Sequence, residues 1–459
     1  MLAAGITPAA AAPVWDETAD VIVVGSGFAG LSAAIEARKA GADVLLIEKM
    51  TSLGGNSALC AGDMAVPASP VQKACGIEGD SAARMAADLL AAGGYRQSEH
   101  AESVAREALA TWRWTADELG VTWNMNRIQS DWGQSVPRGI TLASRSGFSI
   151  VRAEVDALTR LKVRVKTECR MDDVVFEKGR VVGITVTEKW SDAKAVVRRC
   201  RARRGLVLAY GGFSADVAFR SRLNPLLGAD VATSNQPGAT SEAWQAMIRA
   251  GARMMDLASI QVMSWNSSDE RGLGQAWTFI EYATAAFGQW FDAVTGEVLL
   301  KDDRSPQKRT EILLQRTARR HECLAMVSEA GLRESRFDEK RLDDLLIQGV
   351  VRRFDDAASA AARVHLTEAV FLAGFADKRR EGPFYAVTVI PKVHHSQGGL
   401  FIDGRARVYD TAGRPMPGLF AAGEATGGLF GRARIPSHSV TDALVMGRIA
   451  GREAARYRR

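Results

Sequence analysis

The stretch VVGSGFAGL, at residues 23–31, decides how this chain folds. Its small residues have the spacing of a tight loop that joins a strand to a helix, and they are Gly25, Gly27, Ala29 and Gly30. An apolar run at residues 20–24 precedes the loop, a helix-forming segment at 31–40 follows, and a second apolar run covers 42–47. The order predicts a β-α-β unit at the start of an α/β fold.

The chemistry of this loop points to a dinucleotide. Glycines permit the tight turn and let the backbone approach a pyrophosphate, while the following helix presents its free N–H groups to the phosphates. Glu48 ends the second strand about 20 residues after the glycines, where an acidic side chain can accept hydrogen bonds from a ribose. The unit therefore predicts dinucleotide binding.

The composition is that of a globular α/β protein built from two or three lobes. The chain has 459 residues, of which 47% are hydrophobic and 24% are charged. Its apolar runs are shorter than the roughly 20 residues that a membrane helix needs, so we expect no transmembrane segment. The net charge of +6 comes from 59 basic and 53 acidic residues, and the basic run at 198–204 leads into an apolar strand. We interpret that run as a strand edge and expect no nucleic-acid binding.

The five cysteines have no metal-binding or haem-binding spacing. They are scattered, without CxxC or CxxCH, at Cys60, Cys75, Cys169, Cys200 and Cys323. We therefore predict no metal site, no attached haem and no disulfide framework.

Residues 1–12 are small and mostly apolar and end in alanines before Pro13. They resemble the end of an export signal, although a basic first segment is missing. Two locations stay open: a periplasmic one, with residues 1–17 as the remnant of an export signal, and a cytoplasmic one, with residues 1–17 as a leader only. The cytoplasmic alternative is slightly favoured.

Three separated motifs together resemble the fumarate reductase/succinate dehydrogenase flavoprotein superfamily, particularly its soluble flavocytochrome c-like branch, here as a flavin domain without haem. The first joins the glycine loop to EK at 48–49 and GGNS at 54–57, and the second is LAYGGF at 208–213. The third runs from HHSQGG at 394–399 through PGLFAAGEATGG at 417–428 to GRIAG at 447–451.

The resemblance implies FAD as the cofactor. The residues expected to bind it are Gly25, Gly27, Ala29, Gly30, Glu48, Lys49, Gly54, Gly55, Asn56, Ser57, Gly62, Gly211, Gly423, Glu424, Ser439 and Val440. Among these, Glu424 is placed for the ribityl hydroxyls. Asn56 stands where the covalently flavinylated relatives have a histidine, so the resemblance implies non-covalent FAD.

It also implies a Rossmann-like FAD-binding domain of the glutathione-reductase kind with an inserted α+β capping domain. The expected division is 18–256 for the first part of the FAD-binding domain, 257–393 for the capping or substrate domain, and 394–459 for the second part of the FAD-binding domain.

The reaction implied by the resemblance is hydride transfer to a C=C bond. His394 and Arg434 match residues that hold a substrate carboxylate in fumarate-reducing relatives, and two such donors also draw electrons from the double bond. Arg304 is the candidate proton donor, with Glu281 as the relay that returns its proton. Because a guanidinium rarely releases a proton, a second interpretation stays open, in which Arg304 only pairs with Asp302 or Asp303.

Three departures from the relatives concern the substrate pocket. Met263 and Ile280 stand where relatives bind a second carboxylate, and neither can neutralise a buried anion, so fumarate and succinate are disfavoured. Three tryptophans, Trp265, Trp277 and Trp290, either face an apolar substrate tail or belong to the core. His438 follows Arg434 in an unusual PSH segment and either contacts flavin or substrate or is structural.

The leading hypothesis is therefore an FAD-dependent reductase of an α,β-unsaturated monocarboxylate, a small molecule with an apolar tail. One alternative is a dehydrogenase of cyclic ketones, like the ketosteroid dehydrogenases, with Tyr282 or Tyr385 abstracting the proton. Another alternative is a flavin-binding protein without activity. The sequence offers no second electron carrier, so we expect a separate donor: a cytochrome, a flavoprotein or a quinol-linked partner.

Overall fold

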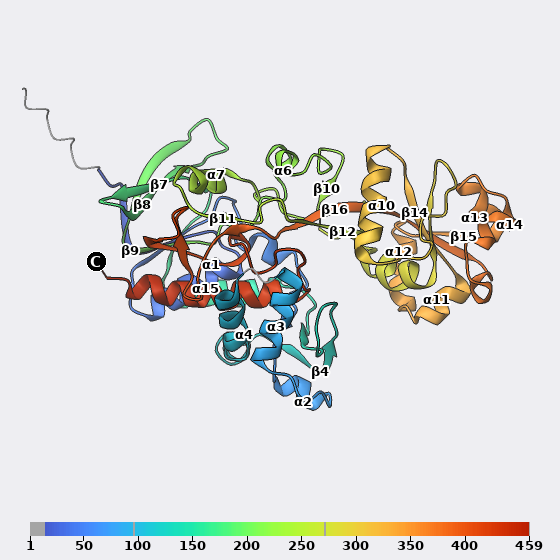
Figure 1. Cartoon of the computed structure of the whole chain (residues 1–459), viewed down its shortest axis with the longest axis horizontal. Coiled ribbons are helices and arrows are strands. Elements are labelled where there is room, and N and C mark those ends of the chain that lie inside the picture. Colours follow the sequence, from blue (N-terminus) through green and yellow to red (C-terminus); the bar gives the residue numbers. More distant parts are fainter. Residues whose placement is uncertain (1–13, 95–96, 270–271, 459) are drawn as a thin grey trace, which may run out of the picture.

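The computed structural model describes residues 14–94, 97–269 and 272–458. The expected leader or export-signal remnant therefore lies almost wholly outside the described residues. The described chain forms a large lobe and a smaller lobe side by side, which gives the molecule an elongated outline (Figure 1).

The large lobe is built on an eight-stranded sheet whose central strands are parallel. The path through its neighbours is β18 (Arg407–Tyr409), β19 (Pro415–Ala421), β9 (Val196–Leu208), β1 (Glu17–Val24), β2 (Val44–Ile47) and β6 (Arg164–Lys166). The antiparallel strands β7 (Cys169–Glu177) and β8 (Arg180–Glu188) continue it from β9. The sheet joins the two ends of the chain, because β19 pairs with β9 beside β1.

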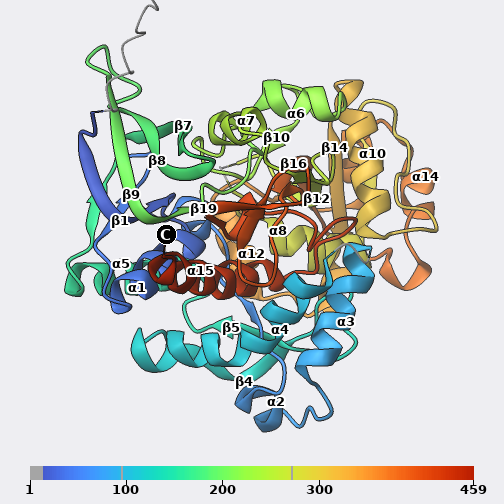
Figure 2. The same ribbon diagram turned by 60° about the vertical axis from the view of Figure 1, so that its left-hand side comes forward.

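Two helices from opposite ends of the chain pack together on this sheet. They are α1 (Phe28–Lys39) and α15 (His438–Arg456), and Figure 2 shows α15 running alongside α1. Glycines make this close approach possible: a Cβ on Gly447 would lie 2.4 Å from the Ala29 carbonyl oxygen, and one on Gly451 would lie 2.2 Å from that of Ala33. The C-terminal helix thereby supports the helix that follows the glycine loop. A further helix, α5 (Phe148–Arg160), also packs against α1.

A helical layer and a small sheet complete the large lobe. The helices are α2 (Pro70–Ala74), α3 (Ala82–Gly93) and α4 (Ser98–Arg113), and the strands β3 (Met64–Ala65), β4 (Trp123–Gln129) and β5 (Gly139–Leu142) form an antiparallel sheet. Short elements fill the remaining connections: α6 (Val217–Leu223), α7 (Glu242–Arg249), β11 (Met254–Met255) and β17 (Gly399–Leu400).

The smaller lobe has its own sheet and its own apolar cores. The sheet contains β10 (Ala232–Thr233), β12 (Ile260–Ser267), β13 (Gln289–Asp292), β14 (Cys323–Ser328), β15 (Arg352–Phe354) and β16 (Phe384–Ser396). Its longer helices are α10 (Pro306–Ala318), α11 (Glu329–Ser335), α12 (Glu339–Ile347), α13 (Ala357–Arg363) and α14 (Glu368–Ala373).

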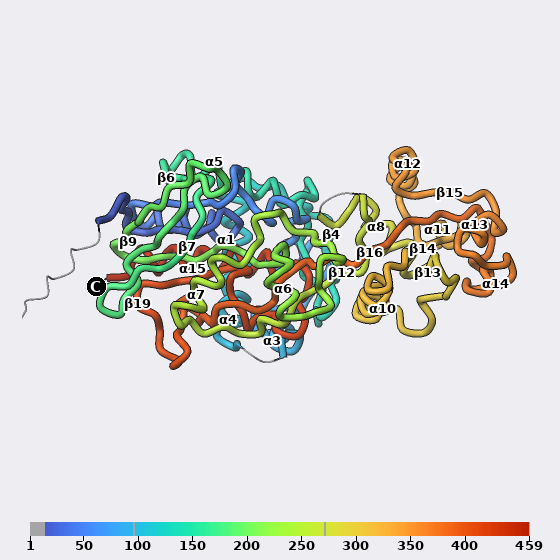
Figure 3. Tube along the Cα trace, turned by 90° about the horizontal axis from the view of Figure 1, so that it is seen from above, coloured from blue at the N-terminus to red at the C-terminus, as the bar shows by residue number. Residues whose placement is uncertain are grey.

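The antiparallel pair β12 and β16 runs between the lobes (Figure 3). The expected boundary at 393/394 falls inside β16, and β10, from the expected first part, pairs with β16. The lobes are thus joined by continuous strands rather than by free linkers. No helix within the described ranges has the length and apolar character needed to cross a bilayer.

Candidate active site

The glycine loop adopts a conformation that only glycine tolerates. Gly25 has φ +98°, and a Cβ there would lie 2.3 Å from the Ala209 carbonyl oxygen. A Cβ on Gly30 would lie 1.9 Å from the Gly25 carbonyl oxygen. The N-cap of α1 is Gly27, which offers no capping side chain, and Ser57 Oγ accepts a hydrogen bond from the Phe28 N–H at 3.0 Å. The other N–H groups of the first turn are suited to bind an anionic ligand.

Glu48 stabilises the loop from the neighbouring strand. Its carboxylate accepts hydrogen bonds from the Ser26 backbone N–H at 3.0 Å and from Ser26 Oγ at 2.5 Å, and it accepts a third from the Met50 N–H at 2.8 Å. The acid at the end of β2 therefore fixes the loop as well as lining the cavity beside it.

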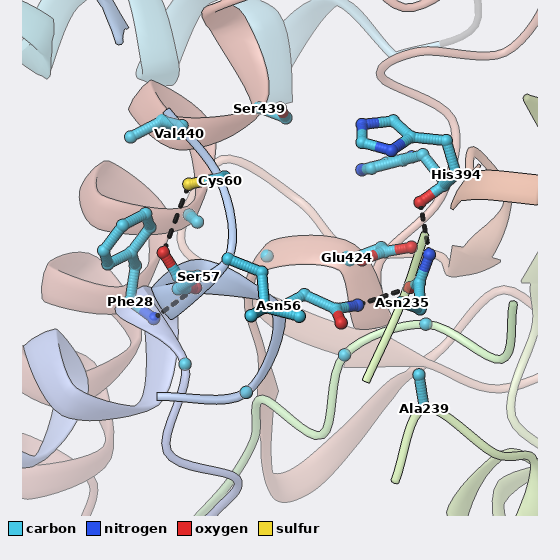
Figure 4. A pocket seen from close by; sticks show the side chains of 18 of the residues that line it. Phe28, Asn56, Ser57, Cys60, Asn235, Ala239, His394, Glu424, Ser439 and Val440 are labelled. Carbon is cyan, nitrogen blue, oxygen red and sulfur yellow. Dashed lines mark hydrogen bonds between the residues drawn. The ribbon is translucent and has the colours of Figure 1, made fainter. Parts of the chain in front are cut away.

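A cavity of about 520 Å³ begins at the loop and reaches the smaller lobe. Most residues predicted to bind the dinucleotide line it: Gly25, Gly27, Ala29, Glu48, Lys49, Gly55, Asn56, Ser57, Gly62, Gly211, Gly423, Glu424, Ser439 and Val440. Figure 4 shows several of these side chains around the hollow. Gly30 and Gly54 do not line it and act behind the loop, where the Gly54 N–H donates to the Ser26 carbonyl oxygen at 3.1 Å.

The shape and the donors of this cavity fit FAD. Gly55 and Gly211 both have positive φ, and a Cβ on either would meet no atom within 4 Å, so open space lies above the backbone. A Cβ on Gly212, by contrast, would lie 2.2 Å from a Glu424 carboxylate oxygen. Glu424 is half-buried, partial removal from water raises its pKa, and it accepts hydrogen bonds from Ser396. The cavity thus pairs an anion-binding helix end with a half-buried carboxylate that can accept from hydroxyls.

A series of amides connects the cofactor end to His394. The Asn56 side chain donates to Asn235 and accepts from the Gln236 N–H at 2.9 Å, and Asn235 Nδ2 donates to the His394 carbonyl oxygen at 2.8 Å (Figure 4). Sequence reasoning missed Asn235, which also lines the cavity. Its signal was weak, because it lies in an SNQPG loop without a motif.

His394 and Arg434, the predicted carboxylate pair, both line the cavity. His394 Nδ1 lies 2.7 Å from Ser234 Oγ, and burial together with the Arg434 charge lowers the pKa of this histidine to about 3. Arg434 donates to Gln261 at 2.8 Å and to Ser439 Oγ at 2.8 Å. Among the described residues no carboxylate lies within ion-pair distance of Arg434, and burial lowers its pKa to about 10. The pair therefore offers a buried cation beside a neutral imidazole.

Within the smaller lobe, Arg304 and Glu281 bind different partners. Arg304 Nη1 donates to the carbonyl oxygens of Ala285 at 3.1 Å and Gly288 at 2.9 Å, and Arg304 does not line the cavity. Glu281 does line it, but its carboxylate binds Arg309 through two hydrogen bonds of 2.7 and 3.1 Å. Sequence reasoning missed Arg309, which is almost fully buried.

The alternative pairing of Arg304 with Asp302 or Asp303 does not occur within the described part of the chain. Burial and the neighbouring charges of Arg379 and Arg309 lower the pKa of Arg304, which favours release of its proton.

The three residues predicted for the substrate pocket separate. Met263 lines the cavity, whereas Ile280 is packed in the core of the smaller lobe and His438 is buried at the start of α15. Ile280 begins the π-helical turn Ile280–Thr284, and its neighbour Glu281 lines the cavity while Ile280 packs in the core. His438 Nδ1 is held by the Pro436 carbonyl oxygen at 2.9 Å.

Of the three tryptophans, Trp265 and Trp277 line the cavity, and Trp290 is a core residue. The two tyrosines of the ketone alternative also separate: Tyr282 lines the cavity, while Tyr385 donates to Glu329 within the smaller lobe.

Comparison with known proteins identifies the family. The sequence profile of the FAD binding domain family matches residues 20–440. The chain belongs to this family. It is 33% identical to the acrylate reductase flavoprotein subunit of Shewanella woodyi, over 95% of this chain and 91% of that relative. It is 30% identical to the urocanate reductase of Eggerthella lenta, over 95% of this chain and 74% of the relative.

A structural comparison agrees on the fold. The open conformation of a flavocytochrome c3 fumarate reductase superposes with a TM-score of 0.82 at 24% identity, covering 96% of this chain and 78% of that one. The resemblance drawn from the motifs is thus confirmed: this flavoprotein is a member of the fumarate reductase/succinate dehydrogenase flavoprotein superfamily, with the expected α/β fold. FAD is its cofactor, and it is an FAD-dependent oxidoreductase of C=C bonds.

Proposed function

We propose that this flavoprotein reduces the C=C bond of an α,β-unsaturated monocarboxylate with an apolar tail. The observation that carries the proposal is Arg434, a buried guanidinium that lines the cavity without a carboxylate partner among the described residues. A buried cation is costly unless an anion pairs with it, and a substrate carboxylate supplies that anion. The activities named for two relatives, reduction of acrylate and of urocanate, are consistent with such a substrate.

In this proposal Arg434 and His394 bind the carboxylate together. Arg434 neutralises it, and the uncharged His394 donates one hydrogen bond from its ring. Both interactions withdraw electrons from the conjugated C=C bond and make the β-carbon more electrophilic. FAD, when bound, supplies the hydride to that carbon.

Arg304 is proposed as the donor of the proton to the α-carbon. Its lowered pKa favours this role, and its bonds to two carbonyl oxygens hold only Nη1, so the rest of the guanidinium stays available. Because Arg304 lies outside the cavity wall, the role requires the smaller lobe to approach the flavin. We propose that Glu281, at the cavity edge, returns the proton.

The tail of the substrate is proposed to lie against Met263, Trp265 and Trp277. None of these side chains can neutralise a second carboxylate, which disfavours dicarboxylates such as fumarate. Of the two positions at which relatives bind a second carboxylate, only Met263 lines the cavity, because Ile280 packs in the core.

We further propose that FAD is held without a covalent bond, because Asn56 is engaged with Asn235 and Gln236 and offers no nucleophile. The electron donor is a separate partner, which we propose to be a cytochrome, another flavoprotein or a quinol-linked protein.

The test is reoxidation of the reduced, FAD-loaded protein under anaerobic conditions. Chemically reduced methyl viologen supplies electrons, and acrylate, 2-butenoate, 3-phenylpropenoate and fumarate are compared. We expect turnover of monocarboxylates at least 10-fold faster than of fumarate. If no propenoate reoxidises the flavin while 4-en-3-one steroids reduce it, the ketone dehydrogenase alternative replaces the proposal.

A further inference from the structure

The side chain of Ser234 lies against the ring of His394, the imidazole at the carboxylate end of the cavity. Ser234 is buried, and both residues line the cavity. Its Oγ lies 2.7 Å from His394 Nδ1, which is the length of a well-formed hydrogen bond. The other ring nitrogen, Nε2, has no hydrogen-bond partner among the described residues. Nε2 is therefore the ring nitrogen that remains for a ligand.

The direction of this hydrogen bond follows from the groups around Ser234. The carbonyl oxygen of Val393 accepts from the Ser234 N–H and from Thr233 Oγ1, both at 3.0 Å. A carbonyl oxygen has two lone pairs, and these two donors use both of them. Ser234 Oγ lies farther from the same oxygen, at 3.4 Å. The proton of the Ser234 hydroxyl is therefore directed to His394 Nδ1.

The direction of the bond decides where the ring proton of His394 resides. Burial and the charge of Arg434 lower the pKa of this histidine to about 3, so the imidazole is neutral. A neutral imidazole has one donor nitrogen and one acceptor nitrogen. Because Nδ1 accepts from Ser234, the proton resides on Nε2. The opposite tautomer would turn a lone pair of Nε2 toward any anion in the cavity.

The backbone fixes Ser234 in this position from both sides. The strand β10 ends at Thr233, and its parallel register with β16 pairs Thr233 with Val393, so that Ser234 follows beside His394. The next residue, Asn235, donates from Nδ2 to the His394 carbonyl oxygen at 2.8 Å (Figure 4). The contact between the hydroxyl and the ring is thus built into the pairing of the strands and needs no substrate to form.

A buried arginine holds the segment that leads into β10. Arg220 is only 1% exposed, and its guanidinium donates to backbone carbonyl oxygens. It donates to Leu227 at 2.9 Å, to Gly228 at 3.0 Å and to Val231, the residue directly before β10. A further bond of 2.7 Å joins it to the Ser214 carbonyl oxygen. The segment before Ser234 is thereby fixed to the body of the large lobe.

We propose that Ser234 is a positioning residue for His394, because its hydroxyl fixes the tautomer that presents Nε2–H to the substrate carboxylate. Ser234 acts through the histidine, and the inference rests on the proposed function, since it requires His394 and Arg434 to bind that carboxylate. It also explains a selectivity for acids over amides. Both site residues then present donors, which suit a carboxylate, whereas the NH₂ group of a carboxamide would meet a donor.

The tautomer is measured by nitrogen NMR of the FAD-loaded, oxidised protein with isotope-labelled histidine. The chain has 6 histidines, and His394→Gln identifies the signals of His394. We expect an unprotonated Nδ1 and a protonated Nε2 in the wild type and in Ser234→Thr, which keeps the hydroxyl. In Ser234→Ala, Nδ1 should be protonated in a measurable fraction of the molecules. A wild-type His394 with its proton on Nδ1, or on both nitrogens, overturns the inference.

The binding test compares butanoate with butanamide, two saturated ligands that the flavin cannot reduce, by titration of the flavin absorbance. Loss of one hydrogen bond corresponds to roughly 3- to 10-fold in affinity. Ser234→Ala should raise the Kd of butanoate by that factor and the Kd of butanamide by less than about 2-fold, while Ser234→Thr restores both. The exposed Ser359→Ala on α13 is the control, because this hydroxyl also donates to a backbone carbonyl oxygen.

The outcomes distinguish failure of the inference from failure of the proposed function. An unchanged tautomer in Ser234→Ala overturns the inference alone, as does an equal change in the Kd of acid and amide. The wild-type spectrum decides the tautomer even if Ser234→Ala does not fold. If butanoate does not bind to the wild type and no propenoate is reduced, the proposed function fails and the inference fails with it.

Discussion

At the carboxylate end of the cavity, Arg434 is buried and fixed by Gln261 and Ser439, whereas on the smaller lobe Arg304 is bound to two carbonyl oxygens and lies outside the cavity wall. Arg434 is already in place to bind a substrate carboxylate. Arg304 can reach a substrate only if one lobe moves toward the other. The comparison indicates that substrate binding is preorganised in the large lobe, while protonation depends on how the smaller lobe is positioned.

The largest effect should come from removing the preformed cation. Arg434→Met should lower kcat/KM by about 10⁴-fold, because both the neutralisation of the carboxylate and the polarisation of the C=C bond are lost. Steady-state kinetics with the preferred propenoate measures this.

The same variant tests whether the arginine serves the fold. Since Arg434 has no carboxylate partner among the described residues, Arg434→Met should unfold at the same temperature as the wild type or a higher one, with its FAD content unchanged. A markedly lower unfolding temperature would make Arg434 a structural residue and contradict the comparison.

The next effect concerns the donor on the smaller lobe. Arg304→Gln should lower kcat by about 10²- to 10³-fold, the usual contribution of a positioned acid, while the Kd of a saturated analogue changes less than about 3-fold. Stopped-flow reoxidation and flavin titration separate the two quantities. The control is the exposed Arg319→Gln, directly after the end of α10. Equal losses in binding and rate would mean that Arg304 contacts the carboxylate in the ground state instead.

A smaller effect, on stability, is expected from breaking the ion pair between Glu281 and Arg309. Arg309→Met leaves Glu281 without its partner and should lower the free energy of unfolding by about 2 kcal/mol, less than a fully buried pair because Glu281 is partly exposed. The double variant Glu281→Gln/Arg309→Met should recover part of that loss, since no charge is left alone. Calorimetry of the single and double variants measures the interaction free energy between the two side chains. Purely additive losses would show that the two side chains do not stabilise each other.

The site residues that can be predicted from the sequence lie mainly in the large lobe, whereas those of the smaller lobe are harder to predict. The glycine loop, Glu48 and Glu424 could be predicted, because short segments with fixed backbone geometry determine where they lie. His394 and Arg434 could be placed because each belongs to a motif of the large lobe.

Arg309 could not be predicted, since its importance arises from a contact between distant segments. Arg309 matters only because α10 returns beside the turn that carries Glu281. The sequence predicts Ile280 in the pocket, but the structure packs it in the core of the smaller lobe and places its neighbour Glu281 in the cavity wall.

The last effect concerns pH and His438, which is buried in the preorganised lobe. Burial lowers the pKa of His438 to about 4, below the ordinary value of 6.5, so the unfolded chain takes up a proton before the folded chain does. Its contribution to stability is therefore complete above pH 6.5 and is lost as the pH falls toward 4, by at most about 1.4 kcal/mol per pH unit.

His438→Asn keeps a donor for the Pro436 carbonyl oxygen but does not titrate. Urea unfolding at pH 7 and pH 5, with saturating FAD, should show about 2 kcal/mol less loss in this variant than in the wild type. The exposed His365→Asn should leave the wild-type pH dependence intact. Parallel losses in all three proteins would mean that His438 is protonated in the folded state, and the buried start of α15 would then carry a charge close to Arg434.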